Sequence, residues 1–379
     1  MAAPACPFCR QRLHFEAAAC TSCGHALAFD PALDGFRYLD AADGRWRAAG
    51  DGGRACAPCD NARYGVCNWL VDRAEGTAFC RACRHNHMIP DLGVPGVLER
   101  WKKIEEAKRR LMRALIRLGL PLETRAERPD ALAFDFLYDP SAEQGYAPQT
   151  LTGHAGGLVT LNLIEADDVA REKMRREMGE PYRTLLGHFR HEVGHHFCFR
   201  LVVGRWLDEF RQLFGDERVD YAAALQAYYA RGSQAPEGWS EHHVSQYATT
   251  HPWEDFAETW AHYLHIVDTL ATIGDFGATL APMPGAQHPS EVDFDPYRAT
   301  TASLVDRWIP FAFAMNAINR AMGQPDLYPF RLAPGVVLKL DFVNRLVADA
   351  GGRRMPTQTP DLEAMIATLG HAVEMPSEG

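Results

Sequence analysis

His191 and His195 occur in the run His191-Glu192-Val193-Gly194-His195, and their spacing constrains the local fold. Residues four apart lie one above the other on a helix, so both imidazoles would project from one side and share a tetrahedral zinc ion. Glu192 would lie about a third of a turn away, where it can reach a water molecule at the metal without being a ligand. The run therefore predicts a helix that carries two zinc ligands and a general base.

The segments around this run support a helix. Residues 182–190 and 197–203 continue an apolar helical pattern, and Pro181 can open the helix. His188 falls on the same stripe as the two histidines, but a further histidine ligand would leave a catalytic zinc ion no open position. We therefore expect a structural or substrate-facing role for His188.

A catalytic zinc ion needs a third protein ligand, and residues 252–271 can supply it. This segment has an apolar helical stripe with Glu254 and Glu258 four apart beside it. Burying a carboxylate beside such a stripe costs desolvation free energy unless a positively charged group pairs with it. We assign Glu254 as the ligand and Glu258 as the acceptor that orients a zinc-bound histidine. The alternative is that both carboxylates only solvate the helix edge. Asp255 points elsewhere on the helix, and we expect it to be a first-turn charge that the helix dipole favours.

The two motifs resemble those of the gluzincin metallopeptidases, in which a glutamate ligand on a second helix follows the two-histidine helix. The second motif is most similar to that of the lethal-factor-like bacterial zinc proteases, whose ligand segment also reads Glu-x-Phe-Ala-Glu. In that group a tyrosine seven residues before the glutamate ligand stabilises the oxyanion. The resemblance implies this role for Tyr247. The alternative is that Tyr247 only contributes to packing.

Over its whole length the chain resembles a bacterial family of zinc-binding metallopeptidases with an amino-terminal zinc-ribbon domain. The strings at residues 182–192 and 251–265 carry this resemblance. Together with the β-prone runs 132–138 and 157–163, it implies an α+β fold: a mainly helical zincin-like domain with a small substrate-side β-sheet, preceded by zinc-ribbon modules. In such proteases an edge strand binds the substrate backbone, and residues 158–163 are our candidate.

Nine of the ten cysteines lie in the amino-terminal quarter of the chain. Two Cys-x-x-Cys knuckles separated by ten residues are typical of a zinc ribbon, in which four thiolates close a tetrahedral structural site. The four ligands are Cys6, Cys9, Cys20 and Cys23. The alternative, two disulfides, would need an oxidising compartment and has poor geometry for adjacent knuckles.

A second cluster contains five cysteines, one more than the four ligands that a structural zinc ion binds. The family pattern implies a second structural zinc ion on Cys59, Cys67, Cys80 and Cys83. Cys56 departs from that pattern, because Cys56-Ala57-Pro58-Cys59 is itself a knuckle and makes Cys56 an alternate ligand. We expect a zinc ribbon at residues 1–30, a second cysteine-rich module at 31–96, and a metallopeptidase domain at 97–379 that begins with a linker helix at 97–120.

Charge and hydropathy limit the classes of partner. Residues 1–97 hold ten basic and ten acidic side chains, and residues 121–379 hold 21 basic and 36 acidic ones, a balance that disfavours nucleic acid. No apolar run is long enough to span a membrane, and the first residues lack the pattern of a signal peptide. We expect a cytoplasmic protein, with a peptide or protein substrate and a protein partner for the ribbons.

The favoured function is zinc-dependent hydrolysis of peptide bonds, with one catalytic and two structural zinc ions, and Glu192 as base. Two alternatives stay open. The first is a non-catalytic, zinc-stabilised module that binds a protein. The second is a DNA-associated protease, although such enzymes usually take a third histidine and have a basic surface.

Overall fold

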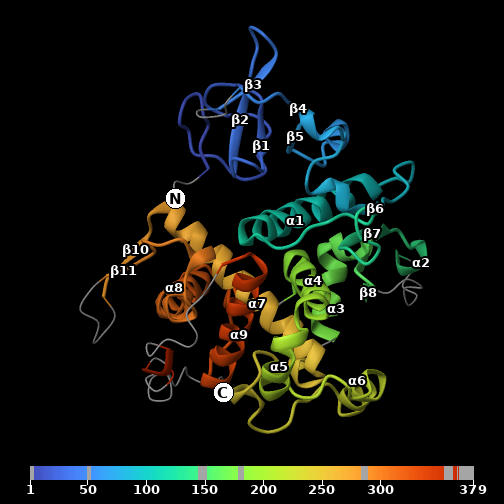
Figure 1. Cartoon of the computed structure of the whole chain (residues 1–379), viewed down its shortest axis with the longest axis vertical. Helices are drawn as coiled ribbons and strands as arrows, with labels where there is room; N and C mark the ends of the chain where they lie inside the picture. The colour runs from blue at the N-terminus through green and yellow to red at the C-terminus, as the bar shows by residue number, and fades with distance from the viewer. Residues whose placement is uncertain are drawn as a thin grey trace. The chain divides into compact units, whose positions relative to one another are not determined.

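The computed structural model describes residues 4–48, 53–143, 152–177, 183–282, 289–353, 362–364 and 366. The fold is α+β, as predicted, and the chain forms two compact units (Figure 1). One unit comprises Met1–Arg117 and Leu122–Lys173, and the other comprises Leu118–Pro121 and Met174–Gly379. In the part of the chain described above, no helix combines the length and the apolar character that crossing a bilayer requires.

The first unit begins with two small sheets that carry the cysteine modules. An antiparallel sheet has the order β1-β2-β3, and a second pairs β4 with β5. The strands are β1 (Leu27–Asp30), β2 (Gly35–Asp40), β3 (Arg45–Arg47), β4 (Cys56–Pro58) and β5 (Leu70–Asp72). The Phe29 and Trp69 rings pack 5.0 Å apart, and Asn68 Nδ2 donates to Phe15 O at 2.8 Å. These contacts join the two modules.

Helix α1 (Val97–Leu118) matches the predicted linker helix and anchors the ribbon within the first unit. Its apolar face is buried, while Arg110 pairs with Glu16 at 2.6 Å and Arg113 pairs with Asp34 at 2.6 Å. Inside the unit, Lys108 and Glu105 form a fully buried ion pair at 2.7 Å. The basic surplus of this helix is therefore partly neutralised by ribbon carboxylates.

The main sheet of the first unit has the order β6-β7-β9-β8. Its strands are β6 (Asn86–Met88), β7 (Ala133–Leu137), β8 (Gly153–Ala155) and β9 (Leu158–Asn162). Strand β9 pairs parallel with β7 and antiparallel with β8, so the prediction that it is an edge strand is wrong. The hairpin turn explains the difference, because Gly157 has φ +82° and a Cβ there would lie 2.2 Å from Asp130 O. The short β8 has no β-prone pattern that would have predicted it.

The other helices follow the order of the chain. They are α2 (Pro140–Glu143), α3 (Asp168–Glu177), α4 (Leu185–Leu201), α5 (Leu207–Phe214), α6 (Tyr221–Ala230), α7 (Pro252–Phe276), α8 (Thr301–Ala321) and α9 (Pro334–Ala350). A small two-stranded sheet pairs β10 (Thr279–Leu280) with β11 (Ser290–Glu291). In the second unit, α7 packs against α4, α5, α8 and α9 (Figure 1). This long helix forms the core on which the candidate site is built.

A buried ion pair joins α7 to α9. Asp255 is 1% exposed, and Lys339 Nζ donates to its Oδ2 at 2.5 Å and to His242 O at 2.6 Å. Burial raises the pKa of the Asp255 carboxyl to about 7, and the ammonium group of Lys339 opposes that rise. Asp255 lies in the first turn of α7, as predicted, and its side chain faces α9.

Candidate metal centre

Helix α4 carries the two histidines and packs closely on α7. It begins at Leu185 after Thr184, whose side chain accepts from Gly187 N at 3.0 Å; Pro181 lies outside the described residues. A Cβ on Gly194 would lie 2.9 Å from Ala257 Cα and 3.2 Å from Trp260 Cβ. Since Gly194 lies between the two histidines, its missing side chain lets their helix approach the helix that carries Glu254.

The start of α7 places Glu254 in its first turn. His251 caps the helix by accepting from Trp253 N at 3.1 Å, and Pro252 occupies a first-turn position where its missing N–H costs nothing. The predicted apolar stripe of α7 is buried, apart from the partly exposed Trp253. Glu254 is 1% exposed, so its carboxylate lies inside the unit.

Three potential ligand atoms converge between α4 and α7. His191 Nε2 lies 3.0 Å from Glu254 Oε2, and His195 Nε2 lies 3.4 Å from the same oxygen. The two Nε2 atoms lie 3.1 Å apart. The structure therefore brings the Glu254 carboxylate close to both imidazoles.

The electrostatics of this cluster favour a cation. Burial opposes the charged form of His191, but hydrogen bonds and charges from Glu254 and Glu258 raise its pKa well above the usual value. Burial would also raise the pKa of Glu254, but the charge of His195 and the hydrogen bonds of both histidines lower it well below the usual value. A field that stabilises an imidazolium here would stabilise a divalent metal ion as well.

The donor set fits zinc. Two imidazole nitrogens and one carboxylate oxygen lie within 4.8 Å of one another, and this set is one that catalytic zinc ions use. Glu254 Oε2 is buried, and the two histidine Nε2 atoms face it at 3.0 and 3.4 Å. A metal ion would satisfy this otherwise costly arrangement. His191, His195 and Glu254 are thus the residues that could hold zinc.

Glu258 orients the first histidine. Its Oε1 lies 2.7 Å from His191 Nδ1, and its Oε2 accepts from Ser245 Oγ at 2.6 Å. When His191 donates from Nδ1, the Nε2 lone pair is free to bind a metal ion. This contact matches the geometry predicted for Glu258. Ser245 was missed because a serine in the loop before α7 has no spacing signal.

Glu192 lies in the same region but outside the three-atom cluster. It is buried, and its Oε1 lies 3.1 Å from His188 Nε2. Burial would raise the pKa of Glu192, but the hydrogen bond and charge of His188, with the charges of His191 and His195, lower it. His188 therefore contacts the predicted base, one helical turn away on α4.

Two tyrosines contact the ligand residues. Tyr221 Oη donates to Glu254 Oε1 at 2.6 Å, and the Tyr247 ring lies 6.0 Å from the His191 ring. Burial, followed by the charge of Glu254, raises the pKa of both phenols, so both hydroxyls stay protonated and can donate. Tyr221 had no sequence signal, because it begins a separate helix 33 residues before Glu254.

The cysteines form two tetrads in the first unit. In each, four sulfur atoms lie within 4.8 Å of one another. The tetrads are Cys6, Cys9, Cys20 and Cys23, and Cys59, Cys67, Cys80 and Cys83. All ten cysteines of the chain lie within the described residues and none forms a disulfide, contrary to the alternative of two disulfides. Four thiolates at this separation fit a closed structural zinc site.

Cys56 is not part of the second tetrad. It lies on β4, where it packs with Ala28 and Leu70 in a small apolar cluster. Its sulfur is not among the four that lie within 4.8 Å of one another. The alternate role considered for Cys56 therefore has no support from the geometry.

The fold and these three clusters define a class: zinc-binding metallopeptidases with zinc-ribbon modules. Residues 97–346 match the family described as "Putative zinc-binding metallo-peptidase", and residues 4–94 match a zinc-ribbon domain. The chain belongs to this metallopeptidase family, as its resemblance had indicated.

Similar proteins occur in mycobacteria. An uncharacterised protein of Mycobacterium bovis and uncharacterised proteins of two Mycobacterium tuberculosis strains are each 42% identical to the chain over 349 residues, which is 90% of this chain and 94% of each relative. No solved structure matches the chain. The comparisons therefore supply the family but no substrate.

Proposed function

We propose that this protein hydrolyses peptide bonds in a zinc-dependent reaction in which Glu192 is the general base. The observation that carries the proposal is the convergence of His191 Nε2, His195 Nε2 and Glu254 Oε2 within 4.8 Å, with the separate carboxylate of Glu192 on the same helix as the histidines. Metal-assisted hydrolysis requires a general base that lies beside the metal ligands and does not itself bind the metal.

Each residue has a defined part in this proposal. Zinc held by His191, His195 and Glu254 would supply a Lewis acid and lower the pKa of water. Glu192 accepts a proton from the attacking water and passes it to the leaving amine. His188 holds the Glu192 carboxylate through the 3.1 Å contact, and Glu258 holds the His191 ring through the 2.7 Å contact. The protonated Tyr247 donates a hydrogen bond to the carbonyl oxygen as negative charge develops on it.

Metal dependence tests the proposal directly. The zinc-loaded full chain should cleave members of a mixed peptide library, lose this activity with a chelator, and regain it with added zinc. Because a chelator could also strip the cysteine tetrads, Glu254→Ala provides the matched control: it should remove one zinc ion per chain, keep the other two, and abolish cleavage. Cleavage that survives either treatment contradicts a zinc peptidase, and a zinc-loaded chain that cleaves nothing supports the non-catalytic alternative.

The role of Tyr247 is tested by removing its hydroxyl. Tyr247→Phe should lower kcat by about 10²-fold with little change in KM, because loss of one oxyanion donor acts on the transition state. Tyr221→Phe is the contrasting variant: it loses the hydrogen bond to Glu254, and should weaken zinc affinity by about 10-fold while kcat at saturating zinc changes little. Unchanged kcat in Tyr247→Phe would leave that residue with a packing role.

A further inference from the structure

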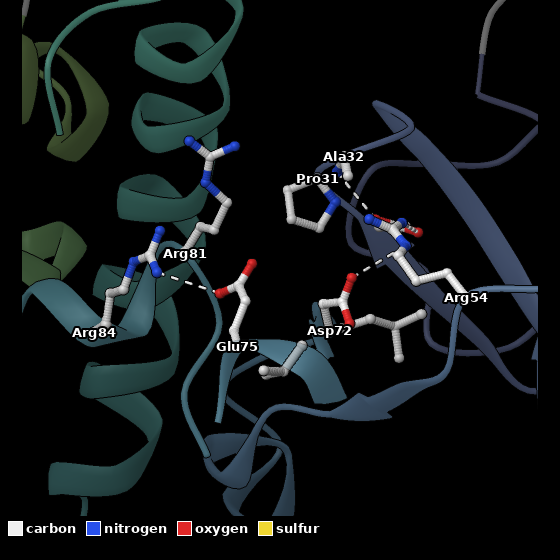
Figure 2. Close-up of a pocket in the computed structure, with 10 residues that line it drawn as sticks. Pro31, Ala32, Arg54, Asp72, Glu75, Arg81 and Arg84 are labelled. Carbon is white, nitrogen blue, oxygen red and sulfur yellow. Dashed lines mark hydrogen bonds and ion pairs between the residues drawn. The ribbon is translucent and has the colours of Figure 1, made fainter. Parts of the chain in front are cut away.

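The first unit has a pocket whose lining includes none of the tetrad cysteines. Its volume is about 190 Å³, and its walls come from the end of β1, from β5 and from the turn between Cys80 and Cys83 (Figure 2). Pro31, Leu70 and Val71 supply apolar surface. The Phe29–Trp69 contact and the hydrogen bond from Asn68 to Phe15 join the ribbon and the second module, so the walls are held together before any ligand arrives.

Most charges around this pocket already have partners. Arg54 pairs with Asp30 and lies 3.5 Å from Asp72, and Arg84 pairs with Glu75 at 3.3 Å. Figure 2 shows these two ion-pair groups on opposite sides of the pocket. The three carboxylates that line the pocket are therefore each engaged by an arginine.

Arg81 is the exception. No hydrogen bond or ion pair among the described residues involves its guanidinium, Glu75 is the acidic group whose charge acts on it, and the side chain is partly buried. In Figure 2 it lies across the pocket from Pro31 and above Glu75. Burial and the neighbouring Arg84 lower the pKa of Arg81, but a guanidinium remains charged at neutral pH. The Cys80–Cys83 turn also fixes its backbone, since both flanking cysteines belong to the second tetrad.

We propose that this pocket binds a carboxylate group of an acidic peptide. The Arg81 guanidinium forms an ion pair with that carboxylate, and Pro31, Leu70 and Val71 contact an adjoining apolar side chain of the peptide. A planar guanidinium matches a carboxylate in a bidentate pair. The one lining arginine outside the ion pairs suits a single carboxylate, whereas three arginines against three carboxylates give the lining no net positive charge to attract an extended polyphosphate such as nucleic acid. The pocket thus makes the cysteine modules a recognition site for a protein, independently of the peptidase reaction.

Peptide binding to the zinc-loaded full chain tests this assignment. The background variant is Glu192→Gln, which keeps the probes intact. Fluorescein-labelled Gly-Leu-Glu-Leu-Gly amide, its Gln counterpart, and the Gln peptide with a free carboxyl end are titrated by fluorescence anisotropy. Binding of the first probe assigns the carboxylate to an acidic side chain, and binding of only the third assigns it to a chain end. Arg81→Gln should lower the affinity for the probe that binds by about 10-fold or more, because the substitution removes a charge-assisted hydrogen-bonded pair.

Arg63→Gln is the matched control. It removes the same charge from an exposed position of the same module, outside the pocket lining, and should change affinity less than twofold. Zinc content and thermal unfolding of both variants should equal those of the parent protein. The proposal is overturned if no probe binds up to about 1 mM, if the Gln amide binds as tightly as the acidic probes, if Arg81→Gln has no effect, or if only inorganic phosphate binds. Peptidase activity is measured separately, so failure here leaves the proposed reaction untouched.

Discussion

Replacing Glu192 with glutamine should leave the zinc content unchanged and lower the rate of peptide hydrolysis by about 10²- to 10⁴-fold, the usual contribution of a general base. Glu192 is not one of the three atoms that converge for a metal ion, so its replacement removes no ligand. The amide has nearly the same shape as the carboxylate and can still accept from His188, but it cannot take a proton from water.

The measurement pairs turnover with metal analysis. Initial rates on a peptide that the parent protein cleaves are compared with zinc per chain for Glu192→Gln. Glu241→Gln is the matched control, because that glutamate is half exposed in the same unit, pairs with Arg331, and should have no effect on either quantity. Full activity in Glu192→Gln would remove the proposed mechanism. Loss of zinc in that variant would mean that Glu192 has a ligand role instead.

Replacing Cys59 with serine should remove one zinc ion per chain and unfold the second cysteine module. The Cys59 thiol is 1% exposed and belongs to the second tetrad. Structural zinc sites of this kind contribute roughly 10–16 kcal/mol of binding free energy to folding, and a short two-stranded sheet has little core to replace it. The pocket that contains Arg81 should be lost as well, because the Cys80–Cys83 turn forms one of its walls.

Cys56→Ser is the control that distinguishes a zinc ligand from a buried cysteine close to it in the sequence. Cys56 is also buried and lies three residues before Cys59, yet it packs with Ala28 and Leu70 and is absent from the tetrad. This variant should keep all its zinc and lose only a little stability. Native mass spectrometry counts the zinc ions, and thermal unfolding reports the stability. If Cys56→Ser lost zinc and Cys59→Ser kept it, the ligand assignment of the second module would have to be exchanged.

Much of the candidate site could be predicted because its signals are local. The four-residue spacing of His191 and His195 places both rings on one helical face wherever that helix packs. Glu254 and Glu258 have the same spacing beside an apolar stripe, and the cysteine knuckles have the spacing of a zinc ribbon.

Other features depend on contacts between segments far apart in the chain. Nothing near Tyr221 indicated that its hydroxyl donates to Glu254, and nothing near Asp255 indicated the buried partner Lys339. The edge-strand prediction for residues 158–163 failed for the same reason, since β8 pairs with β9 through a turn that the hydrophobic pattern does not reveal. Helix α9 was not predicted at all.

The amino-acid sequence by itself determined the donor groups, the helical faces on which they lie, and the two knuckles of the first tetrad, because these depend on spacing over a few residues. Only the tertiary structure decided which carboxylate meets which histidine, which of five cysteines stays outside the second tetrad, and which arginine of the described pocket lining forms no ion pair. The physical reason is that burial, pairing and desolvation are set by side chains brought together from distant parts of the chain, and these have no fixed spacing in the sequence.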